Sequence, residues 1–387
     1  MTGAGSAPGA SGPDAAGLAA AGAAALGVPL AGPVPLAASA RSAVLRCREP
    51  GGGTVVVKGY PRDDEGAASF AAEAAGLTLA AGSGLAPRLL AADPGSLTIV
   101  MSDLGTAPSM ADLLLDSHVP DAARPAAAAL TGWARALGQL AAHGAGQAAE
   151  HARLLARYGG VPGSGYVAQL GARIQDTAQR AARIGVTAVP GGLDDELGQL
   201  AEFAAATRYQ VFSPGDVCPD NNLVTRDGVR FVDFEAAGFH PVFLDAAYLR
   251  MPFSSCWCVA TLPQALAASA EAAYRAGVTR VYPDLAGDAT WQHGVRLAMA
   301  AWTLSSLGSL LAGALAGDAP LTAGRPAPGW RQLLRHRWRT VAAELAVSGE
   351  LPAVLALTRE LLAATRHWQA PRLGSYPALP AGLPAGG

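Results

Sequence analysis

The sequence predicts an α+β protein with two lobes, a small lobe built on an antiparallel sheet and a large, mainly helical lobe. Short β-branched runs separated by turn residues lie between residues 36 and 104. Apolar residues at helical spacing dominate most of the chain after Met110. A chain of 387 residues is also long enough for two units that each bury a hydrophobic core.

The small lobe, residues 36–104, is expected to contain a hairpin, a helix and a further strand. Residues 44–47 and 54–57 are the expected hairpin strands, because a cluster of Pro and Gly lies between them. Residues 67–81 have the composition and apolar spacing of a helix. Residues 97–101, Leu-Thr-Ile-Val-Met, predict the next strand.

The large lobe, residues 105–368, is expected to be helical apart from one hairpin. The apolar runs at residues 223–225 and 229–233 flank a turn at residues 226–228 that contains an Asp-Gly step. An Asp-Gly step between two apolar runs is a strong local signal for a hairpin. This turn therefore predicts a pair of strands within the helical lobe.

The two ends of the chain differ in composition from the lobes. Residues 1–35 form an Ala/Gly-rich segment that is expected to be partly disordered, above all over residues 1–12. Residues 369–387 form a Pro/Gly-rich tail. The first 40 residues contain no Arg or Lys, so the basic start of a secretory signal is missing.

The longest apolar stretch, Leu297 to Gly317, is nearly long enough to cross a membrane. It contains Ser305, Ser306 and Ser309 and lies within a series of helical patterns, which favours a buried core helix. We therefore expect a protein without a membrane partner.

The charge balance indicates no nucleic-acid partner, since 30 acidic residues accompany 28 basic ones. One segment is rich in arginine and contains Arg331, Arg335, Arg337 and Arg339. Because apolar residues such as Trp338 lie among these arginines, the segment is interpreted as an amphipathic helix with a solvated charged face.

The four cysteines are too few and too unevenly placed for a disulfide scaffold, which favours a reducing, cytoplasmic setting. An alternative is a thiolate metal site formed by Cys218, Cys256 and Cys258, with His240 as a fourth ligand. The Cys-x-Cys step lacks the gap of roughly two to four residues that is typical of structural zinc sites. We therefore predict buried free thiols.

Lys58 is the only lysine in the chain, and every other basic residue apart from histidine is an arginine. It follows the apolar run at residues 54–57. A compact ammonium can pivot between phosphate oxygens, whereas the rigid guanidinium fork of arginine cannot replace it there. The choice of lysine at this position therefore indicates a chemical role.

A turn-rich loop at residues 213–224 holds Asp216 and, five positions later, Asn221. After the predicted hairpin comes an Asp-Phe-Glu step that begins at Asp233. Phosphoryl transfer from a nucleotide requires a carboxylate that orients or deprotonates the acceptor hydroxyl, and oxygen ligands that hold Mg²⁺ across the phosphates. Asp216 fits the first role, and Asn221 and Asp233 fit the second.

In the small lobe, Lys58 can contact nucleotide phosphates, and Glu73 on the following helix can hold the ammonium in place. The chain order of lysine, helical glutamate, Asp-x4-Asn loop, hairpin and Asp-Phe-Glu resembles the aminoglycoside phosphotransferase and choline kinase-like superfamily, relatives of the protein kinases. Residues 214–221 are similar to that family's His-Gly-Asp-x4-Asn loop, and residues 233–235 to its metal-binding segment. The resemblance covers about residues 36–250 by motif order.

The resemblance implies a protein kinase-like fold with ATP or GTP and Mg²⁺ held between the two lobes. The nucleotide base would bind to the backbone around Ser102, Asp103 and Leu104. A loop that includes Ser42 would cover the phosphates with its backbone amides.

The resemblance also implies two supporting residues, Asp245, which would accept hydrogen bonds from the catalytic loop, and Glu235. The sequence departs from the family pattern at two points. Pro214 stands where the family has a histidine, and no Gly-x-Gly-x-x-Gly motif occurs near Ser42.

The expected function is that of an ATP-dependent kinase that phosphorylates a hydroxyl group of a metabolite or natural product, with an antibiotic as a minority option. The alternative is a catalytically silent kinase-like binding module in a biosynthetic complex, which Pro214 and the weak phosphate loop favour. From Val259 to Gly387 the chain has 11 arginines and 7 acidic residues, which disfavours a polycationic acceptor. The expected partners are therefore a nucleotide and a neutral or anionic small molecule with a hydroxyl group.

Overall fold

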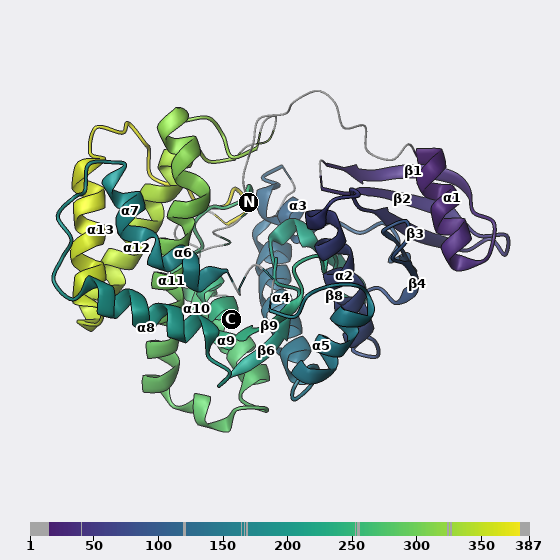
Figure 1. The fold of residues 1–387 in the computed structure, drawn as a ribbon, viewed down its shortest axis with the longest axis horizontal. Helices are drawn as coiled ribbons and strands as arrows, with labels where there is room; N and C mark the ends of the chain where they lie inside the picture. The colour runs from purple at the N-terminus through teal and green to yellow at the C-terminus, as the bar shows by residue number, and fades with distance from the viewer. Residues whose placement is uncertain are drawn as a thin grey trace.

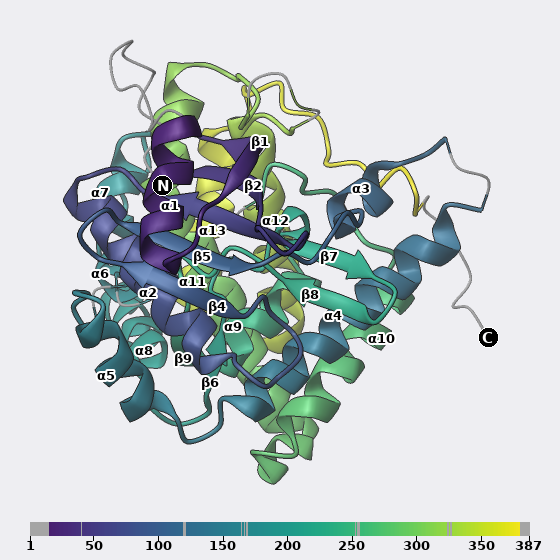
Figure 2. The same cartoon turned by 90° about the vertical axis from the view of Figure 1, so that its right-hand side faces the viewer.

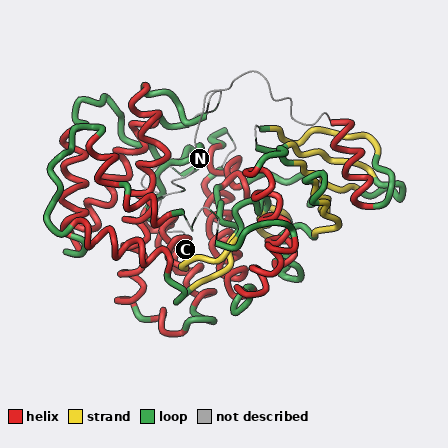
Figure 3. The backbone as a smooth tube through the Cα atoms, viewed as in Figure 1, coloured by secondary structure: helices red, strands yellow, loops and turns green. Residues whose placement is uncertain are grey.

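The computed structural model describes residues 15–379, except residues 40, 119–120, 164, 166, 168, 252, 254–255, 323–324 and 326. The predicted disorder of residues 1–12 lies outside these described residues. An antiparallel sheet lies at one side of the molecule and most helices lie at the other (Figures 1 and 3). This arrangement confirms the predicted α+β, two-lobed fold class.

The small lobe is a five-stranded antiparallel sheet in the order β1-β2-β3-β5-β4. The predicted hairpin is formed by β2 and β3, in which Leu45 pairs with Val57, and the predicted strand at residues 97–101 is β5. The strands are β1 (Ala31–Ala38), β2 (Ala43–Arg48), β3 (Thr54–Gly59), β4 (Leu89–Asp93) and β5 (Thr98–Ser102).

The two faces of this sheet have different neighbours. Because side chains alternate along a strand, Val55 and Val57 point to one face of β3 and Lys58 points to the other. Helix α2 (Asp64–Leu79), predicted at residues 67–81, lies on the Lys58 face, where its glutamate contacts the lysine. The alternation of side chains along β3 therefore places the Lys58 ammonium on the face of the sheet that packs against α2.

The opposite face is covered by helix α1 (Ala15–Leu26), within the segment 1–35 to which the sequence assigned no helix or strand. Leu18 is 2% exposed and packs with the valines of β3. An Ala-rich helix of this length is marginal alone and shows little contrast between its faces, so packing on the sheet stabilises it. Strand β1 also begins before residue 36, where the small lobe was expected to start.

The large lobe consists of helices with two short strand pairs inserted among them (Figure 2). The predicted hairpin is formed by β7 and β8, with Thr225 opposite Gly228. Strands β6 and β9 form the second pair. The elements are α3 (Met110–Leu115), α4 (Ala123–His143), α5 (Ala148–Arg157), α6 (Leu170–Gln175), α7 (Thr177–Ala182), α8 (Leu193–Ala205), β6 (Gln210–Ser213), η1 (Pro219–Asn221), β7 (Asn222–Thr225), β8 (Gly228–Phe231), β9 (Gly238–Pro241), α9 (Val242–Ala246), η2 (Ala247–Leu249), α10 (Gln264–Val278), η3 (Pro283–Ala286), α11 (Asp288–Ala316), α12 (Trp330–Ser348) and α13 (Pro352–Ala364).

Helix α11 contains the apolar stretch that begins at Leu297. By length and composition the helix could cross a membrane, but 78% of its most apolar window is buried inside the protein. It packs against α6, α9 and α12. The prediction of a core helix in this stretch is therefore confirmed.

Helix α12 corrects one prediction, because its arginines do not form a solvated face. Arg337 is 4% exposed, and Arg331 and Arg335 donate hydrogen bonds to carbonyl oxygens of the neighbouring helices α11 and α13. The helix lies between those two helices and so has little free surface. The amphipathic pattern showed that Trp338 is buried, but it could not show that a second helix covers the charged side.

Helices α4 and α10 approach each other closely at two glycines, Gly138 and Gly277. A Cβ atom added to Gly138 would lie 2.7 Å from the carbonyl oxygen of Tyr274, which is closer than real Cβ contacts. The backbone of α10 cannot move aside as a flexible side chain could. The contact between the two helices therefore requires glycine at this position.

We expect Gly138→Ala to lower the free energy of unfolding by about 1 to 3 kcal/mol, because the added methyl group forces the two helices apart. Gly198→Ala in α8 is the matched control, since nothing lies within 4 Å of its added Cβ. Alanine is also the better helix former, so the control should be neutral or slightly stabilising. Urea unfolding followed by circular dichroism measures both; equal stabilities would contradict the close packing.

Candidate active site

Lys58 brings together residues that are far apart in the sequence. Its Nζ atom lies 2.5 Å from Oε2 of Glu73 and 2.5 Å from Oδ1 of Asp233, residues 15 and 175 positions away. A third carboxylate oxygen, Oε2 of Glu235, lies 3.8 Å from the same nitrogen. The only lysine therefore joins helix α2 of the small lobe to the segment after β8 in the large lobe.

The environment of Lys58 is nearly closed to solvent, since its side chain is 5% exposed and that of Glu73 is 1% exposed. Burial alone would lower the pKa of Lys58, but attraction to Glu73, Asp233 and Glu235 outweighs burial and raises it. Tyr60, which the sequence analysis did not single out, donates its hydroxyl to Glu73, and its ring centroid lies 5.1 Å from the Lys58 ammonium. Tyr60 could have been predicted as part of the site, because residues two positions apart along an extended chain point to the same side and Tyr60 follows Lys58 by two.

The loop between β6 and β7 carries Asp216 in a fixed backbone arrangement. Gly215 has φ of +82°, and a Cβ there would lie 2.0 Å from the carbonyl oxygen of Ala236, so only glycine fits. Oδ1 of Asp216 accepts a hydrogen bond from the backbone N–H of Cys218 at 3.2 Å. The side chain of Asn221 donates to the Asp216 carbonyl oxygen at 3.2 Å.

A second asparagine, Asn222, also holds this loop and was missed by the sequence analysis. It is fully buried, and its Nδ2 donates to the carbonyl oxygens of Val217 at 3.2 Å and Cys218 at 2.5 Å. Two consecutive asparagines at the start of a predicted strand were the available signal, because asparagine is depleted in strands. Asn222 therefore fixes the loop, while Asn221 beside it is half-buried.

Asp233 lies directly after β8 in the left-handed region of backbone space, with φ of +66°. Such a conformation is uncommon for a residue other than glycine and is enriched at functional sites. The N–H of the preceding residue, Val232, donates to the carbonyl oxygen of Asn221 at 2.9 Å. The structure thus brings Asn221 and Asp233 to adjacent positions, as the motif order predicted.

Asp216 and Glu235 lie in a strongly negative region. Burial and the nearby carboxylates of Asp233 and Asp220 raise the pKa of Asp216 to about 7. Burial and Asp233 also raise the pKa of Glu235, although Lys58 and Arg41 oppose this shift. Protonation is therefore one way for this group of carboxylates to reduce their mutual repulsion.

The charge count of the cluster indicates what ligand it could accept. Four carboxylates, those of Glu73, Asp216, Asp233 and Glu235, surround two cationic side chains, Lys58 and Arg41. Asp220, which also acts on Asp216, adds a fifth carboxylate, so the negative charges exceed the positive ones if all are ionised. Oxygen donors in such an excess fit Mg²⁺, which prefers hard oxygen ligands.

The loop that joins β1 to β2 lies beside this cluster. Arg41 Nη1 is 2.6 Å from Oε1 of Glu235, which joins the loop to the segment after β8. The backbone N–H of Ser42 donates to Oγ of Ser39 at 3.2 Å, so this amide is used within the turn. The structure therefore places the Ser42 loop next to the cluster, and Arg41 of this loop contacts the cluster through Glu235.

The linker after β5 is anchored to the small lobe through Asp103. Arg46 donates to Asp103 from Nε at 2.6 Å and from Nη2 at 3.0 Å, and Thr54 donates at 2.7 Å. Burial alone would raise the pKa of Asp103, but these hydrogen bonds outweigh burial and lower it. Ser102 donates its backbone N–H to the carbonyl oxygen of Arg88 at 2.9 Å, and Leu104 follows Asp103 in the linker.

Asp245 lies beneath the loop between β6 and β7 and is 1% exposed. Its Oδ1 is 3.0 Å from Nε2 of His240 and accepts from Oγ of Ser213 at 3.2 Å. The same Ser213 hydroxyl accepts a hydrogen bond from the N–H of Gly215 at 3.1 Å. His240 on the neighbouring strand β9 thus supplies an imidazole next to the loop, in which Pro214 stands in place of the family's histidine. Because His240 contacts Asp245, it is not a ligand beside the cysteines.

The cysteines correct the prediction of free thiols. Cys218 of the catalytic loop forms a disulfide with Cys256, 38 positions later, with Cα atoms 5.6 Å apart. Cys258 and Cys47 are free and buried. The spacing of the cysteines could not reveal this pairing, because it depends on how the turn around Cys256 folds onto the catalytic loop.

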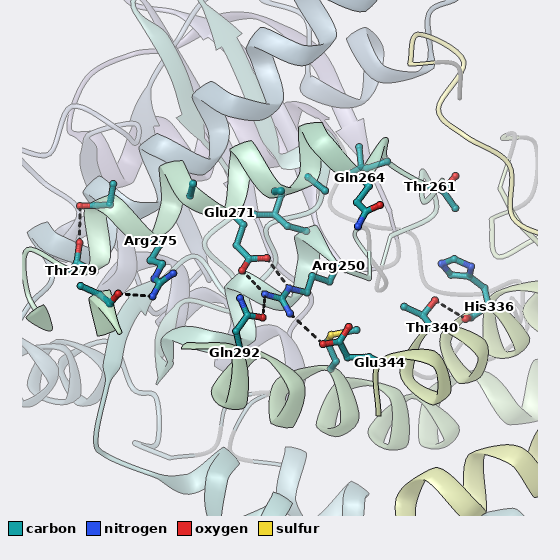
Figure 4. A pocket seen from close by; sticks show the side chains of 18 residues that line it. Arg250, Thr261, Gln264, Glu271, Arg275, Thr279, Gln292, His336, Thr340 and Glu344 are labelled. Atoms are coloured by element: carbon teal, nitrogen blue, oxygen red, sulfur yellow. Dashed lines mark hydrogen bonds and ion pairs between the residues drawn. The ribbon is translucent and has the colours of Figure 1, made fainter. Parts of the chain in front are cut away.

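A separate hollow of about 840 Å³ lies between α10, α11 and α12 (Figure 4). Several of its polar side chains are paired with one another: Arg250 contacts Glu271 at 2.6 Å, Gln292 at 2.6 Å and Glu344 at 3.5 Å. None of the residues that line it belongs to the predicted site. The hollow is therefore a feature separate from the cluster around Lys58 and Asp216.

The fold is similar to that of several solved structures. A fructosamine-3-kinase homologue from Thermobifida fusca matches with a TM-score of 0.50 and 21% identity over 85% of this chain and 98% of its own. A choline/ethanolamine kinase family protein from Mesorhizobium loti matches with a TM-score of 0.47 and 18% identity, over 85% and 93% of the two chains. A macrolide 2'-phosphotransferase from Brachybacterium faecium matches with a TM-score of 0.46 and 18% identity, over 90% and 97%.

No curated protein matches the sequence. The sequence pattern of the phosphotransferase enzyme family matches residues 34–287, which include every predicted site residue. With its antiparallel-sheet small lobe and helical large lobe, the chain therefore belongs to the phosphotransferase enzyme family, within the aminoglycoside phosphotransferase and choline kinase-like superfamily.

Proposed function

We propose that the protein is an ATP-dependent kinase that transfers the γ-phosphoryl group to a hydroxyl of a small molecule. The observation that carries this proposal is the contact of Lys58 with both Glu73 and Asp233, beside the loop of Asp216. A phosphoryl-transfer site needs a point cation, metal ligands and a carboxylate within one cluster. The side chains around Lys58 supply all three.

Asp216 is proposed as the residue that orients the acceptor hydroxyl and takes its proton. Its Oδ1 already accepts a backbone hydrogen bond, which leaves Oδ2 for the acceptor. A general base works best when its pKa lies near the working pH, and the pKa of Asp216 is about 7 before any cation binds. Asp245 and Ser213 keep the loop in place beneath it.

Asn221 and Asp233 are proposed to hold Mg²⁺, which supplies charge neutralisation on the phosphates when bound. Lys58, positioned by Glu73, would then contact phosphate oxygens in place of the Asp233 carboxylate. Glu235 supports the cluster through Arg41 and Lys58.

The nucleotide is proposed to bind between the lobes. Its base would contact the backbone of Ser102, Asp103 and Leu104, a linker that Arg46 and Thr54 hold rigid through the Asp103 carboxylate. The Ser42 loop would lie over the phosphates. A nucleotide substrate also favours a cytoplasmic setting, in which cellular thiols are kept reduced.

The acceptor is proposed to be a neutral or anionic metabolite or natural product. From Val259 to Gly387 the chain has 11 arginines and 7 acidic residues, which disfavours a polycation in this part of the protein. Pro214 in the catalytic loop favours the competing reading, a catalytically silent binding module. The hydrogen bond between His240 and Asp245 opposes it, because an imidazole still supports the loop.

Acceptor-dependent ATP consumption tests the proposal directly. We expect wild-type protein with Mg-ATP to consume ATP with at least one acceptor among sugars, amino alcohols, antibiotics and peptides. Asp216→Asn serves as the blank, and Asp227→Asn in the exposed β7–β8 turn serves as the matched control, since Asn-Gly also suits that turn. Wild-type consumption equal to the blank with every acceptor would favour the silent module.

Removal of either central carboxylate should lower turnover by several orders of magnitude once an acceptor is known. Asp216→Ala removes the base and Asp233→Ala removes a metal ligand, and electrostatic positioning provides most of the rate in such enzymes. Steady-state kinetics of both variants measure the loss. Near wild-type phosphate transfer by either one would show that its role is assigned wrongly.

Nucleotide binding should depend on Mg²⁺ and on Asp233. A ligand at about 100 times its dissociation constant stabilises the folded state by about 2.7 kcal/mol, so Mg-ATP should raise Tm measurably. Asp233→Asn should reduce the part of the shift that EDTA removes, whereas Asp227→Asn should leave it unchanged. An absent shift at millimolar Mg-ATP, or the same Mg²⁺ dependence in both variants, would contradict the assigned site.

The raised pKa of Asp216 predicts a pH dependence of stability in metal-free buffer. Because the folded protein binds this proton more tightly than the unfolded chain, Asp216 contributes less to the free energy of unfolding as pH rises from about 4 to 7. Asp216→Asn removes that loss. Its stability gain over wild type should be larger near pH 8 than near pH 5, by at least about 1.4 kcal/mol, the equivalent of one pKa unit.

Urea unfolding with EDTA at both pH values measures this difference. Asp227→Asn, whose parent residue is exposed, should show the same difference from wild type at both pH values. If the stability gain of Asp216→Asn does not change with pH, the pKa of Asp216 is not raised in the folded protein.

A further inference from the structure

Four potential metal-ligand atoms meet beside the catalytic loop. The sulfur atoms of Cys218, Cys256 and Cys258 and a carboxylate oxygen of Asp220 all lie within 4.8 Å of one another. Cys218 and Asp220 come from the loop and η1 after β6, and the other two come from the turn after η2. This group, here called the cysteine corner, therefore joins two segments of the large lobe.

The cysteine corner is enclosed by protein. Cys218, Cys256 and Cys258 are 5%, 2% and 1% exposed. Trp257 donates its indole N–H to Oδ2 of Asp220 at 2.6 Å, while Oδ1 of the same carboxylate lies 3.8 Å from the Cys256 sulfur. The carboxylate is thus oriented by an outer partner with its other oxygen toward the sulfurs, an arrangement typical of metal ligands.

A backbone donor also faces the sulfurs, since the N–H of Cys258 points to Sγ of Cys256 at 3.4 Å. Hydrogen bonds of this kind stabilise a thiolate more than a neutral thiol.

The disulfide by itself accounts for only two of the four groups. It joins Cys218 to Cys256 and leaves the Cys258 thiol and the Asp220 carboxylate beside it. Within the described residues no ion pair involves Asp220, although it adjoins the buried sulfurs. Asp220 is half-buried, and its oxygen that faces the sulfurs is free to serve as a metal ligand while the other accepts the Trp257 hydrogen bond.

We propose that, when the Cys218–Cys256 disulfide is reduced, the cysteine corner binds one Zn²⁺ through the three sulfurs and Asp220. A dithiol reductant supplies two electrons and two protons to the S–S bond and itself becomes a disulfide. Zn²⁺ then displaces the thiol protons to the buffer. Sulfur ligands around tetrahedral zinc with Zn–S bonds of about 2.3 Å lie roughly 3.8 Å apart. The two formerly bonded sulfurs must therefore separate, and ligand atoms that now lie up to 4.8 Å apart must move closer.

The site is structural, because four protein ligands leave no open position for a substrate. It ties the turn at residues 256–258 to the loop that carries Asp216, two positions before Cys218. Its ligands differ from the alternative set considered from the sequence, which the Cys-x-Cys spacing disfavoured, since His240 is bound to Asp245 and Asp220 takes its place. The inference does not depend on the proposed kinase activity, since metal content is measured without an acceptor.

The full-length protein, reduced with a phosphine and dialysed anaerobically against equimolar Zn²⁺, tests the proposal. We expect one zinc per chain by elemental analysis. With Co²⁺ in place of Zn²⁺ we expect a thiolate-to-cobalt charge-transfer band and strong visible bands, both of which indicate tetrahedral thiolate ligation. Absence of bound metal in the reduced protein, or a cobalt spectrum without the charge-transfer band, would overturn the proposal.

Cys258→Ala is the decisive variant, because it removes a proposed ligand and leaves both cysteines of the disulfide. Cys47→Ala in β2 is the matched control, since Cys47 is also buried and free but lies in the small lobe. We expect Cys258→Ala to lose more zinc affinity than the roughly 10–100-fold typical for loss of an outer partner, while Cys47→Ala keeps wild-type affinity.

Equal zinc affinity in these two variants would overturn the proposal. If Cys258→Ala fails to fold, the cobalt spectrum of the wild-type protein decides alone.

Discussion

The buried ammonium of Lys58 links the small lobe to the large lobe. It lies between Glu73 of the small lobe and Asp233 of the large lobe, at 2.5 Å from each. Removing one partner of a buried ion pair is strongly destabilising, because a charge then remains in a low-dielectric interior without compensation. Helix α2, strand β3 and the backbone at Asp233 must therefore each place a charged side chain at the same point. The other residues of the candidate site are arranged around that contact.

The loop between β6 and β7 is held by hydrogen bonds from buried side chains of the large lobe. Asn222 binds two loop carbonyls. Oδ1 of Asp245 reaches the loop through the Ser213 hydroxyl and also contacts Nε2 of His240. Asn222, Asp245, Ser213 and His240 are all buried, and they support the loop beside carboxylates that repel each other. The repulsion among these carboxylates raises the free energy of the empty site, and binding of a proton or a cation lowers it. This property suits a protein that binds a metal–nucleotide complex.

The cysteine corner adds a second constraint on the same loop. Cys218 lies between Asp216, the proposed base, and Asn221, a proposed metal ligand. Whether its sulfur is joined to Cys256 directly or through a zinc ion, the loop is tied to the turn that follows η2. The chemistry of that link depends on the redox state of its surroundings, while its mechanical effect on the loop is the same.

Local patterns were sufficient to predict the strands around Lys58, the hairpin after Asn221 and the core helix that follows Leu297. Each of these depends on side-chain alternation, turn residues or apolar length within a short window. The motif order also predicted a single site that contains Asp216 and Asp233. Long-range packing decided the remainder: helix α1 on the sheet, the covered arginines of α12, the support from Tyr60, and the pairing of Cys218. These features depend on which distant segments come to lie together, and no short stretch of sequence records that.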